Sequence, residues 1–368
     1  MRIAFDHQIF GWQRFGGISR YFFELANHLA KDPNQPAECR IVCPVLVTDY
    51  LRQAAPALQV TGMYAPAIRR TGRIYRILNR MLAPFFLRRW RPDILHETYY
   101  SQKTVAPRDC RIVLTVFDMI HELYPEYYPS WDTTRKEKAA AVARADHIIC
   151  ISENTRADLI RLLQVPKEKT SVVHLGFSLS NDSLVNLPPP RRPFILFVGL
   201  RAGYKNFNRL LQAYASRPKL RDSYDLVAFG GGSFSAQEFA LIQHLNLDPG
   251  QVHHVGGADA LLGTLYKQAT LFVYPSLYEG FGIPPLEAMS FDCPVACSNT
   301  SSMPEVVADA AILFDPSDTE SIADSLETLC SDKQLRAELR QRGHKRLEAF
   351  SWHRCALETM SIYKKVLQ

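Results

Sequence analysis

Two glutamates eight positions apart frame the stretch of this chain that is best suited to chemistry. Glu279 and Glu287 flank a glycine-bearing loop and the start of a predicted helix. The loop between them contains Gly280, Phe281 and Gly282, followed by Pro284 and Pro285. A carboxylate accepts two hydroxyl hydrogen bonds, which suits a diol, and a helix N-terminus favours an anion. The pattern predicts a site for a polyhydroxyl, anionic ligand, and the alternative is acidic residues that only stabilise a helix N-terminus.

A second loop carries two cations. Arg201 and Lys205 stand four positions apart after the apolar run 194–198. Both can contact one diphosphate, the guanidinium as a planar fork and the ammonium as a point charge. The alternative is that both are solvated surface charges.

A third loop ends in Gly16 and Gly17, before a helical pattern over residues 19–30. Glycine lets the backbone approach a ligand closely, and the helix start offers N–H groups to an anion. The alternative is an ordinary turn between a strand and a helix. Gly17 is therefore a candidate for binding the same ligand.

The elements that position these loops are short apolar runs separated by helical patterns. Such runs, without polar alternation, are typical of a parallel sheet covered on both faces. Ligands of such sheets bind beyond the carboxyl ends of the strands, where the loops above lie. The predicted strands are 2–6, 40–47, 94–96, 111–117, 147–151 and 171–175, then 194–198, 225–229, 252–255, 271–274, 294–297 and 311–314.

The domain boundary is predicted from a proline-rich segment, residues 181–193, which has three prolines in a row. The strand pattern restarts after it, so two doubly wound α/β domains are expected to face each other across a cleft. We expect an N-terminal domain over 1–185 and a C-terminal domain over 186–350. A last helix over 351–368 is expected to pack back on the N-terminal domain.

Composition indicates a globular protein. The 368 residues are 47% hydrophobic and 22% charged, without an apolar run long enough to span a membrane. No secretory signal is visible and the eight cysteines are scattered, which favours a reduced, cytoplasmic protein. The pairs Cys39/Cys43 and Cys293/Cys297 lack histidines at zinc spacing and are interpreted as packing thiols.

The positive charge lies in the first half of the chain. Residues 1–185 have 25 Lys and Arg against 18 Asp and Glu, whereas the whole chain has a net charge of +6. Much of the excess is in the segment from Arg69 to Arg91, which interleaves eight arginines with apolar residues. This segment predicts a basic amphipathic helix that binds an anionic membrane surface or an acceptor phosphate, and the alternative is a surface helix with solvated arginines. No nucleic-acid module is visible, so no nucleic-acid partner is expected.

Taken together, these motifs resemble a known family. Glu279-Gly-Phe-Gly-Ile-Pro-Pro-Leu-Glu287 is similar to the E-x7-E signature of retaining glycosyltransferases of family 4, which have the GT-B fold. Four further segments agree in order along the chain. They are the Gly16-Gly17 loop, the segment 199–206, Ser302-Met-Pro-Glu305 and Phe350-Ser-Trp352.

The resemblance implies a role for each candidate residue. It implies that Glu287 binds the ribose hydroxyls of a nucleotide and that Glu279 lies by the hydroxyls of the donor sugar. A histidine of the N-terminal domain is expected near the reacting carbon. Here that role falls on His121, with Asp118 as a second candidate, because the family's His-Asp pair is Phe117-Asp118 in this chain. A loop histidine with a structural role is the alternative.

The implied reaction is transfer of a sugar from a nucleotide-diphosphate donor to a hydroxyl of a glycan or lipid-linked glycan. The chain has no Asp-x-Asp motif, so we expect no metal cofactor, with Arg201 and Lys205 in place of the ion. The sequence around 279–305 is most similar to bacterial mannosyl- and rhamnosyltransferases of surface polysaccharide assembly, which makes GDP-mannose the first candidate donor. Two alternatives stay open, a sugar-nucleotide epimerase on the same fold and a non-catalytic protein that binds a glycan or an anionic lipid.

Overall fold

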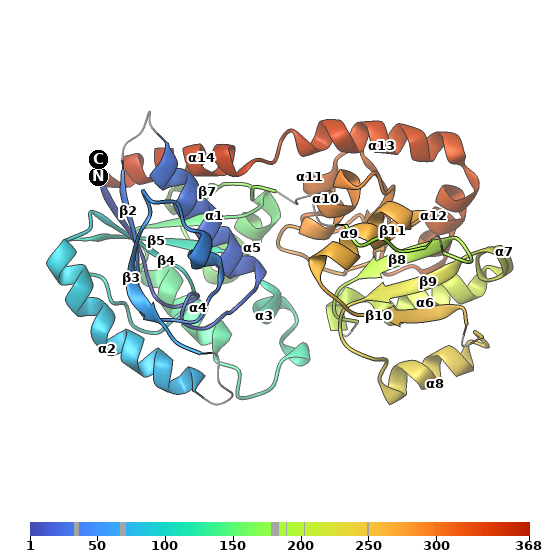
Figure 1. Ribbon diagram of the computed structural model, residues 1–368, viewed down its shortest axis with the longest axis horizontal. Helices are drawn as coiled ribbons and strands as arrows, with labels where there is room; N and C mark the ends of the chain where they lie inside the picture. Colours follow the sequence, from blue (N-terminus) through green and yellow to red (C-terminus); the bar gives the residue numbers. More distant parts are fainter. Residues whose placement is uncertain (33–36, 67–70, 178–183, 189, 202, 249) are drawn as a thin grey trace. The chain divides into compact units, whose positions relative to one another are not determined.

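The computed structural model describes residues 1–368 except 33–36, 67–70, 178–183, 189, 202 and 249. Two compact units make up the chain (Figure 1). Unit 1 comprises Met1–Gly176 and Phe350–Gln368, and unit 2 comprises Phe177–Ala349. The last helix therefore belongs to unit 1.

The boundary between the units lies before the proline-rich segment and not at 185/186. Part of that segment is outside the described residues, but Val185 is bound to unit 2. Its N–H donates to Thr264 Oγ1 at 3.1 Å, and the Thr264 hydroxyl lies 3.0 Å from the Val185 carbonyl oxygen. Val185 is therefore held on unit 2 and is not part of a free linker.

Unit 1 is built on a seven-stranded parallel sheet in the order β3-β2-β1-β4-β5-β6-β7. Its strands are β1 (Arg2–Phe5), β2 (Glu38–Leu46), β3 (Gln59–Tyr64), β4 (Ile94–Glu97), β5 (Arg111–Val116), β6 (His147–Cys150) and β7 (Thr170–Val172). Its helices are α1 (Gly17–Lys31), α2 (Gly72–Trp90), α3 (Ile120–Leu123), α4 (Thr134–Arg144), α5 (Glu153–Leu163) and α14 (Trp352–Leu367).

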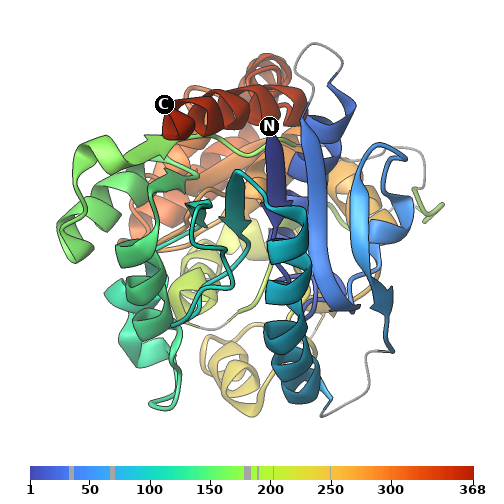
Figure 2. The ribbon, with the colours of Figure 1, turned by 90° about the vertical axis from the view of Figure 1, so that its left-hand side faces the viewer.

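Successive residues of these strands point to opposite faces of the sheet. On β1, Ala4 packs with the buried side of α2, whereas Phe5 contacts Phe22 of α1. On β4, His96 is hydrogen-bonded to Tyr363 of α14 at 2.5 Å. Helices α1 and α14 thus cover one face of the sheet and α2 covers the other, and the pairing of α14 with unit 1 can be followed in Figure 2.

Unit 2 is built on a six-stranded parallel sheet in the order β10-β9-β8-β11-β12-β13. Its strands are β8 (Phe194–Val198), β9 (Asp225–Phe229), β10 (Val252–Val255), β11 (Leu271–Tyr274), β12 (Val295–Ser298) and β13 (Ala311–Phe314). Its helices are α6 (Phe207–Ser216), α7 (Pro218–Ser223), α8 (Ala236–His244), α9 (Asp259–Gln268), α10 (Ile283–Ser290), α11 (Met303–Val307), α12 (Thr319–Ser331) and α13 (Lys333–Leu347).

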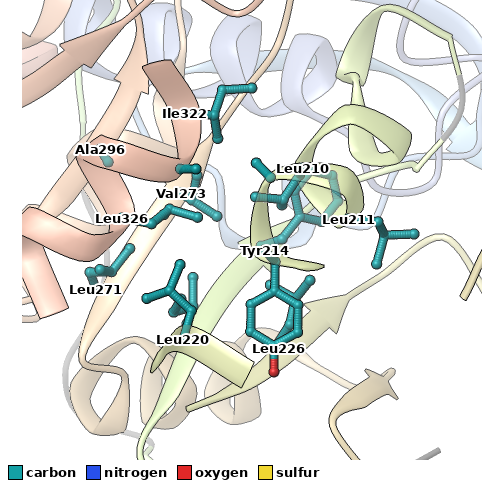
Figure 3. Close-up of a cluster of buried hydrophobic side chains, with 14 of the residues drawn as sticks. Leu210, Leu211, Tyr214, Leu220, Leu226, Leu271, Val273, Ala296, Ile322 and Leu326 are labelled. Atoms are coloured by element: carbon teal, nitrogen blue, oxygen red, sulfur yellow. The ribbon is translucent and has the colours of Figure 1, made fainter. Parts of the chain in front are cut away.

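A core of buried hydrophobic side chains, aliphatic and aromatic, covers one face of this sheet (Figure 3). Leu210 and Tyr214 of α6, Leu326 of α12 and Leu226 and Val273 of the strands are all fully buried in it. The core orients β8 and β11, whose carboxyl ends lead into the two loops with the candidate residues.

The predicted parallel sheets and their helical cover are confirmed. One strand, β3, was not predicted from the sequence. It is an edge strand whose side chains are mostly exposed, and it lacks the apolar run by which the others were found.

Candidate functional site

The loops after β8 and β11 meet in unit 2 through an ion pair. Lys205 Nζ lies 2.6 Å from Glu279 Oε1 and 3.0 Å from the hydroxyl of Tyr274. The strands are neighbours in the sheet, which brings their carboxyl ends together. Both charged side chains are largely buried. Two of the predicted residues, far apart in sequence, therefore form one polar cluster at the edge where ligands of such sheets bind.

The backbone around Glu279 is held by two serines that the sequence analysis did not assign. The Glu279 N–H donates to Ser301 Oγ at 3.0 Å. The buried Ser302 hydroxyl lies 3.0 Å from the carbonyl oxygen of Glu279 and 2.8 Å from that of Phe281. The resemblance included Ser302 but gave it no role, and only its position in the fold shows that it shapes this loop.

Gly282 is required by the backbone at the start of α10. Its φ of +103° is in the region that favours glycine, and a Cβ there would lie 2.1 Å from Met303 Cε. Helix α10 begins one residue later, at Ile283. The next two positions are prolines, which have no N–H. The first turn of this helix therefore has two N–H groups fewer than a helix without prolines.

Glu287 lies on α10, where the resemblance placed a ribose-binding carboxylate. The hydroxyl of Tyr266, which is fully buried on α9, donates to Glu287 Oε2 at 3.2 Å. This bond fixes the orientation of the carboxylate. Gly280 and Phe281 complete the loop between the two glutamates and are both buried.

Arg201 makes contacts within unit 2 that the sequence analysis did not predict. Its side chain is buried and its guanidinium is used inside unit 2. It bonds Glu238 Oε1 at 2.7 Å and the carbonyl oxygens of Gly230, Gly232 and Ser233 at 2.6, 2.7 and 3.0 Å. A guanidinium has five N–H donors, and these contacts leave it little capacity for a diphosphate.

The loop that Arg201 holds consists of three glycines after β9. Gly230, Gly231 and Gly232 all have positive φ, at +91°, +72° and +72°. Arg201 also stacks on the ring of Phe234 at 4.8 Å. In this structure Arg201 holds the glycine loop and Lys205 is the cation that contacts Glu279, so the diphosphate contact predicted for Arg201 stays a prediction.

Asp118 and His121 lie in unit 1, after β5. Asp118 Oδ1 accepts a hydrogen bond from the Ile120 N–H at 3.0 Å, so it forms the turn. The His121 ring stacks on Tyr128 with centroids 3.9 Å apart. Its buried Nδ1 has no hydrogen-bond partner among the described residues. Burial, together with the charge of Lys138, lowers the pKa of His121, which favours a neutral ring.

Lys138 is the residue of this region that the sequence analysis missed. Its side chain has no exposed area and lies on α4 beneath the turn. Its Nζ donates to Glu122 Oε2 at 2.7 Å and to the Asp118 carbonyl oxygen at 2.9 Å. In sequence it belongs to a run of charged residues, which gives no sign that one of them is buried.

Gly17 is the first residue of α1, which begins two residues before the helical pattern expected over 19–30. A Cβ at Gly17 would meet no atom within 4 Å. The Gln13 side chain already accepts the N–H of Ser19 at 3.3 Å, so part of this helix start is capped from within the chain.

Within the described ranges, no cluster of three or more His, Cys, Asp or Glu side chains is arranged to hold a metal ion. The eight cysteines are buried as free thiols. In the same ranges, no helix combines the length and apolar character that crossing a bilayer requires.

Two Rossmann-like parallel-sheet units of this kind define the GT-B fold of glycosyltransferases. Sucrose-phosphate synthase from Thermosynechococcus elongatus superposes with a TM-score of 0.76 at 20% identity, over 99% of this chain and 98% of that one. Anabaena HepE in complex with UDP and glucose superposes with a TM-score of 0.71 at 17% identity, over 99% of each chain. These similarities establish the fold.

Sequence comparisons establish the family. Residues 15–181 match the model of Glycosyltransferase Family 4, and residues 181–346 match that of Glycosyl transferases group 1. O-antigen chain mannosyltransferase B of Escherichia coli is 31% identical over 306 residues, which cover 79% of each protein. The chain therefore belongs to the family 4 glycosyltransferases with the GT-B fold, and it is a glycosyltransferase.

Proposed function

We propose that the protein is a retaining, metal-independent mannosyltransferase. It transfers mannose from GDP-mannose to a hydroxyl of a glycan or lipid-linked glycan in the assembly of a surface polysaccharide of the O-antigen or lipopolysaccharide type. The observation that carries the proposal is the contact of Lys205 with Glu279 at the carboxyl edge of the unit 2 sheet. The sugar is proposed from the similarity to O-antigen chain mannosyltransferase B.

The residues of unit 2 divide the work of holding the donor. Lys205 contacts the diphosphate, and Glu279, on the other side of the ion pair, accepts hydrogen bonds from the hydroxyls of the sugar. Glu287, oriented by Tyr266, binds the ribose diol. As the bond between the anomeric carbon and phosphate breaks, its electron pair leaves with the β-phosphate. The positive charge of Lys205 stabilises that charge where it develops.

The acceptor oxygen forms the new bond to the anomeric carbon on the face that the diphosphate leaves. Its proton passes to the departing diphosphate, so that no protein base is consumed. His121 is proposed to contact the donor sugar as a neutral ring, in keeping with its lowered pKa. Asp118 acts on this step through the turn that carries His121.

A thermal-shift panel of GDP, UDP, ADP and the corresponding sugar nucleotides tests the donor. A ligand that binds only the folded protein raises its Tm. We expect GDP and GDP-mannose to raise the Tm, and Lys205→Ala and Glu287→Ala to reduce the shift. A shift with uridine but no guanine nucleotides would contradict the choice of donor.

The stereochemistry and the metal requirement are measured on the product. Proton NMR of the glycoside formed from GDP-mannose should show the α configuration of the donor, with the same rate in EDTA. A β product would contradict retention. Conversion of GDP-mannose to an epimer in the absence of acceptor would favour the epimerase. A Lys205→Ala, Glu279→Ala variant that keeps its biological effect would favour a non-catalytic binding protein.

We also propose that unit 1 binds the anionic inner face of the cytoplasmic membrane through α2. This helix exposes Ile77, Met81 and Phe85 to 59%, 71% and 66%. Ile74, Leu78 and Leu82 are exposed beside them. The arginines of the same helix supply the opposite charge to anionic lipids, although Arg69 and Arg70 lie outside the described residues.

Flotation with liposomes that contain anionic phospholipid tests this contact at low salt. We expect Ile77→Ser, Phe85→Ser to abolish flotation. Phe239→Ser, which changes an exposed aromatic of unit 2, is the matched control and should float like the unmodified protein. Equal flotation of the unmodified protein and both variants would contradict the proposed membrane contact of α2.

A further inference from the structure

The turn between β12 and α11 holds the loop that carries Glu279. Thr300 Oγ1 donates to the Leu277 carbonyl oxygen at 3.1 Å. Ser301 Oγ accepts the Glu279 N–H at 3.0 Å, and the Ser302 hydroxyl lies 3.0 Å from the Glu279 carbonyl oxygen. Three consecutive hydroxyls therefore fix the backbone of the loop, and the position of the Glu279 carboxylate depends on the position of the turn.

The turn and the helix that follows it need support from the rest of unit 2. Ser301 has a φ of +54° and Ala308 a φ of +49°, in a region that residues other than glycine rarely adopt. Helix α11 lies between these two residues and has only five residues, far fewer than an isolated helix needs. Such conformations persist only where surrounding contacts hold them, so the contacts of α11 decide where the turn lies.

Arg346 of α13 makes two of these contacts. Its Nε donates to the Val306 carbonyl oxygen at 2.8 Å, and its Nη2 donates to the Glu305 carbonyl oxygen at 2.6 Å. The last carbonyl groups of a helix have no partner within the helix, and the helix dipole favours a cation beside them. Met303 and Val307 of α11 are fully buried. Helix α11 is thus held by the core of unit 2 and by Arg346 of α13, and both helices can be followed in Figure 1.

A second arginine of α13 makes the same kind of contact with a different helix. Arg336 Nη1 donates to the Cys330 carbonyl oxygen at 2.8 Å and also to that of Leu329, at the end of α12. None of the candidate site residues lies on α12. The contact of Arg336 therefore shows what a bond of this kind contributes to stability alone.

We propose that Arg346 is a positioning residue for sugar transfer. It acts through α11 and Ser302 on the backbone of Glu279, and so on the carboxylate beside the donor sugar. The inference rests on the proposed function in assigning Glu279 to the hydroxyls of that sugar. A misplacement of about 1 Å caused far from the reacting atoms can lower a rate about a hundredfold. A nucleoside diphosphate has no such sugar, so its binding should change much less than the rate of transfer.

Transfer kinetics and binding of the nucleoside diphosphate test the proposal together. We expect Arg346→Gln to lower kcat at least about tenfold and to change the Kd of the nucleoside diphosphate less than about threefold. Arg346→Lys keeps the charge but reaches fewer carbonyls. It should lower kcat by about threefold, and it decides the question if Arg346→Gln does not fold.

The matched control is Arg336→Gln, which removes the same kind of contact from the end of α12. This variant should keep kcat within about twofold, even where it lowers the Tm as much as Arg346→Gln does. Equal kcat values in the variants of Arg346 and Arg336 would make Arg346 a residue that only stabilises unit 2 and would overturn the proposal.

The route through α11 is tested by combining Arg346→Gln with Ser302→Ala. Two changes on one route are not independent, so the kcat of the double variant should lie within about threefold of that of the slower single variant. A double variant in which the two separate losses multiply would show that Arg346 and Ser302 act independently, which would overturn the route.

Hydrogen exchange tests the same route without any donor. The Glu279 N–H is protected by its bond to Ser301. We expect Arg346→Gln to speed exchange in peptides that cover residues 277–282 at least about tenfold, and Arg336→Gln to leave this exchange unchanged. Unchanged exchange in Arg346→Gln would overturn the proposal. If the unmodified protein transferred no sugar from any nucleotide donor, the proposed function would fail, whereas this measurement would still decide whether Arg346 positions the loop.

Discussion

The buried ion pair beneath His121 offers a sharp test of how unit 1 positions its candidate residues. Lys138 has a side chain without exposed area, and its partner Glu122 is 2% exposed. The pair also bonds the Asp118 carbonyl oxygen, so it ties α4 to the turn after β5. Replacing Lys138 by methionine keeps most of its volume and removes only the charge and its hydrogen bonds.

The expected loss of stability in Lys138→Met follows from the state of Glu122 in that variant. Its Oε1 already has no hydrogen-bond partner within the described structure, and Lys138→Met removes the partner of Oε2. An uncompensated buried charge of this kind destabilises a protein by about 3–5 kcal/mol. Lys138→Met, Glu122→Leu removes both charges, and replacement of a whole buried pair by apolar residues is often neutral. We therefore expect the double variant to recover most of the loss.

Hydrogen exchange on peptides from β5 and β6 measures the opening free energy of unit 1 separately from that of unit 2. Lys136→Met is the matched control, because this lysine is exposed on the same helix. The reasoning would be refuted if Lys138→Met cost less than about 1 kcal/mol, or if the double variant were no more stable than the single one. If the pair orients His121, the stable double variant should still show a reduced kcat.

Three further results are expected. Arg201→Lys should destabilise unit 2 by about 2–4 kcal/mol in urea unfolding, because an ammonium cannot reach Glu238 and all the carbonyls of the glycine loop at once, and some of them lose their N–H donor; weaker GDP binding at unchanged stability would instead support a direct diphosphate contact. Burial lowers the pKa of His96 from 6.5 to about 3, so the unfolded chain takes up its proton first and stability falls with pH below 6.5. The loss of stability due to His96 amounts to about 1.4 kcal/mol between pH 7.5 and 5.5. The His96→Gln variant should not show this loss when urea midpoints are measured at both pH values. Gly282→Ala should lower the Tm and slow transfer, because the Cβ strains the backbone and meets Met303; an unchanged Tm would contradict the need for glycine.

The fold was predictable because its elements follow local rules. Strands buried on both faces require uninterrupted apolar runs, and these runs are visible in one sequence. The edge strand β3 was not predictable in this way, because its residues are mostly exposed and Gly62 interrupts it. The predicted domain boundary at 185/186 differs from the boundary of the two units, which lies after Gly176. A run of prolines indicates irregular backbone, but it does not show on which unit that backbone packs.

The candidate site was predictable in its residue types and only partly in its contacts. The meeting of Lys205 with Glu279 follows from the adjacency of β8 and β11, which alternating strands and helices suggest. The direction of Arg201 does not follow from its spacing, since two residues of an irregular loop need not point the same way. Burial of Lys138 depends on tertiary packing, and nothing in its neighbourhood of charged residues distinguishes it from its solvated neighbours.

The ion pair of Lys205 bears on how a donor enters unit 2. An ammonium has three N–H donors, and the described structure uses two of them, for Glu279 and the Tyr274 hydroxyl. One donor is left for a phosphate oxygen, so a diphosphate can bind without breaking the pair. The Glu279 carboxylate has lone pairs beyond the one that Lys205 uses, so it can also accept a hydrogen bond from a sugar hydroxyl. The same pair that joins the two loops therefore presents a positive group to the phosphate and a hydrogen-bond acceptor to the sugar, as the proposed donor requires.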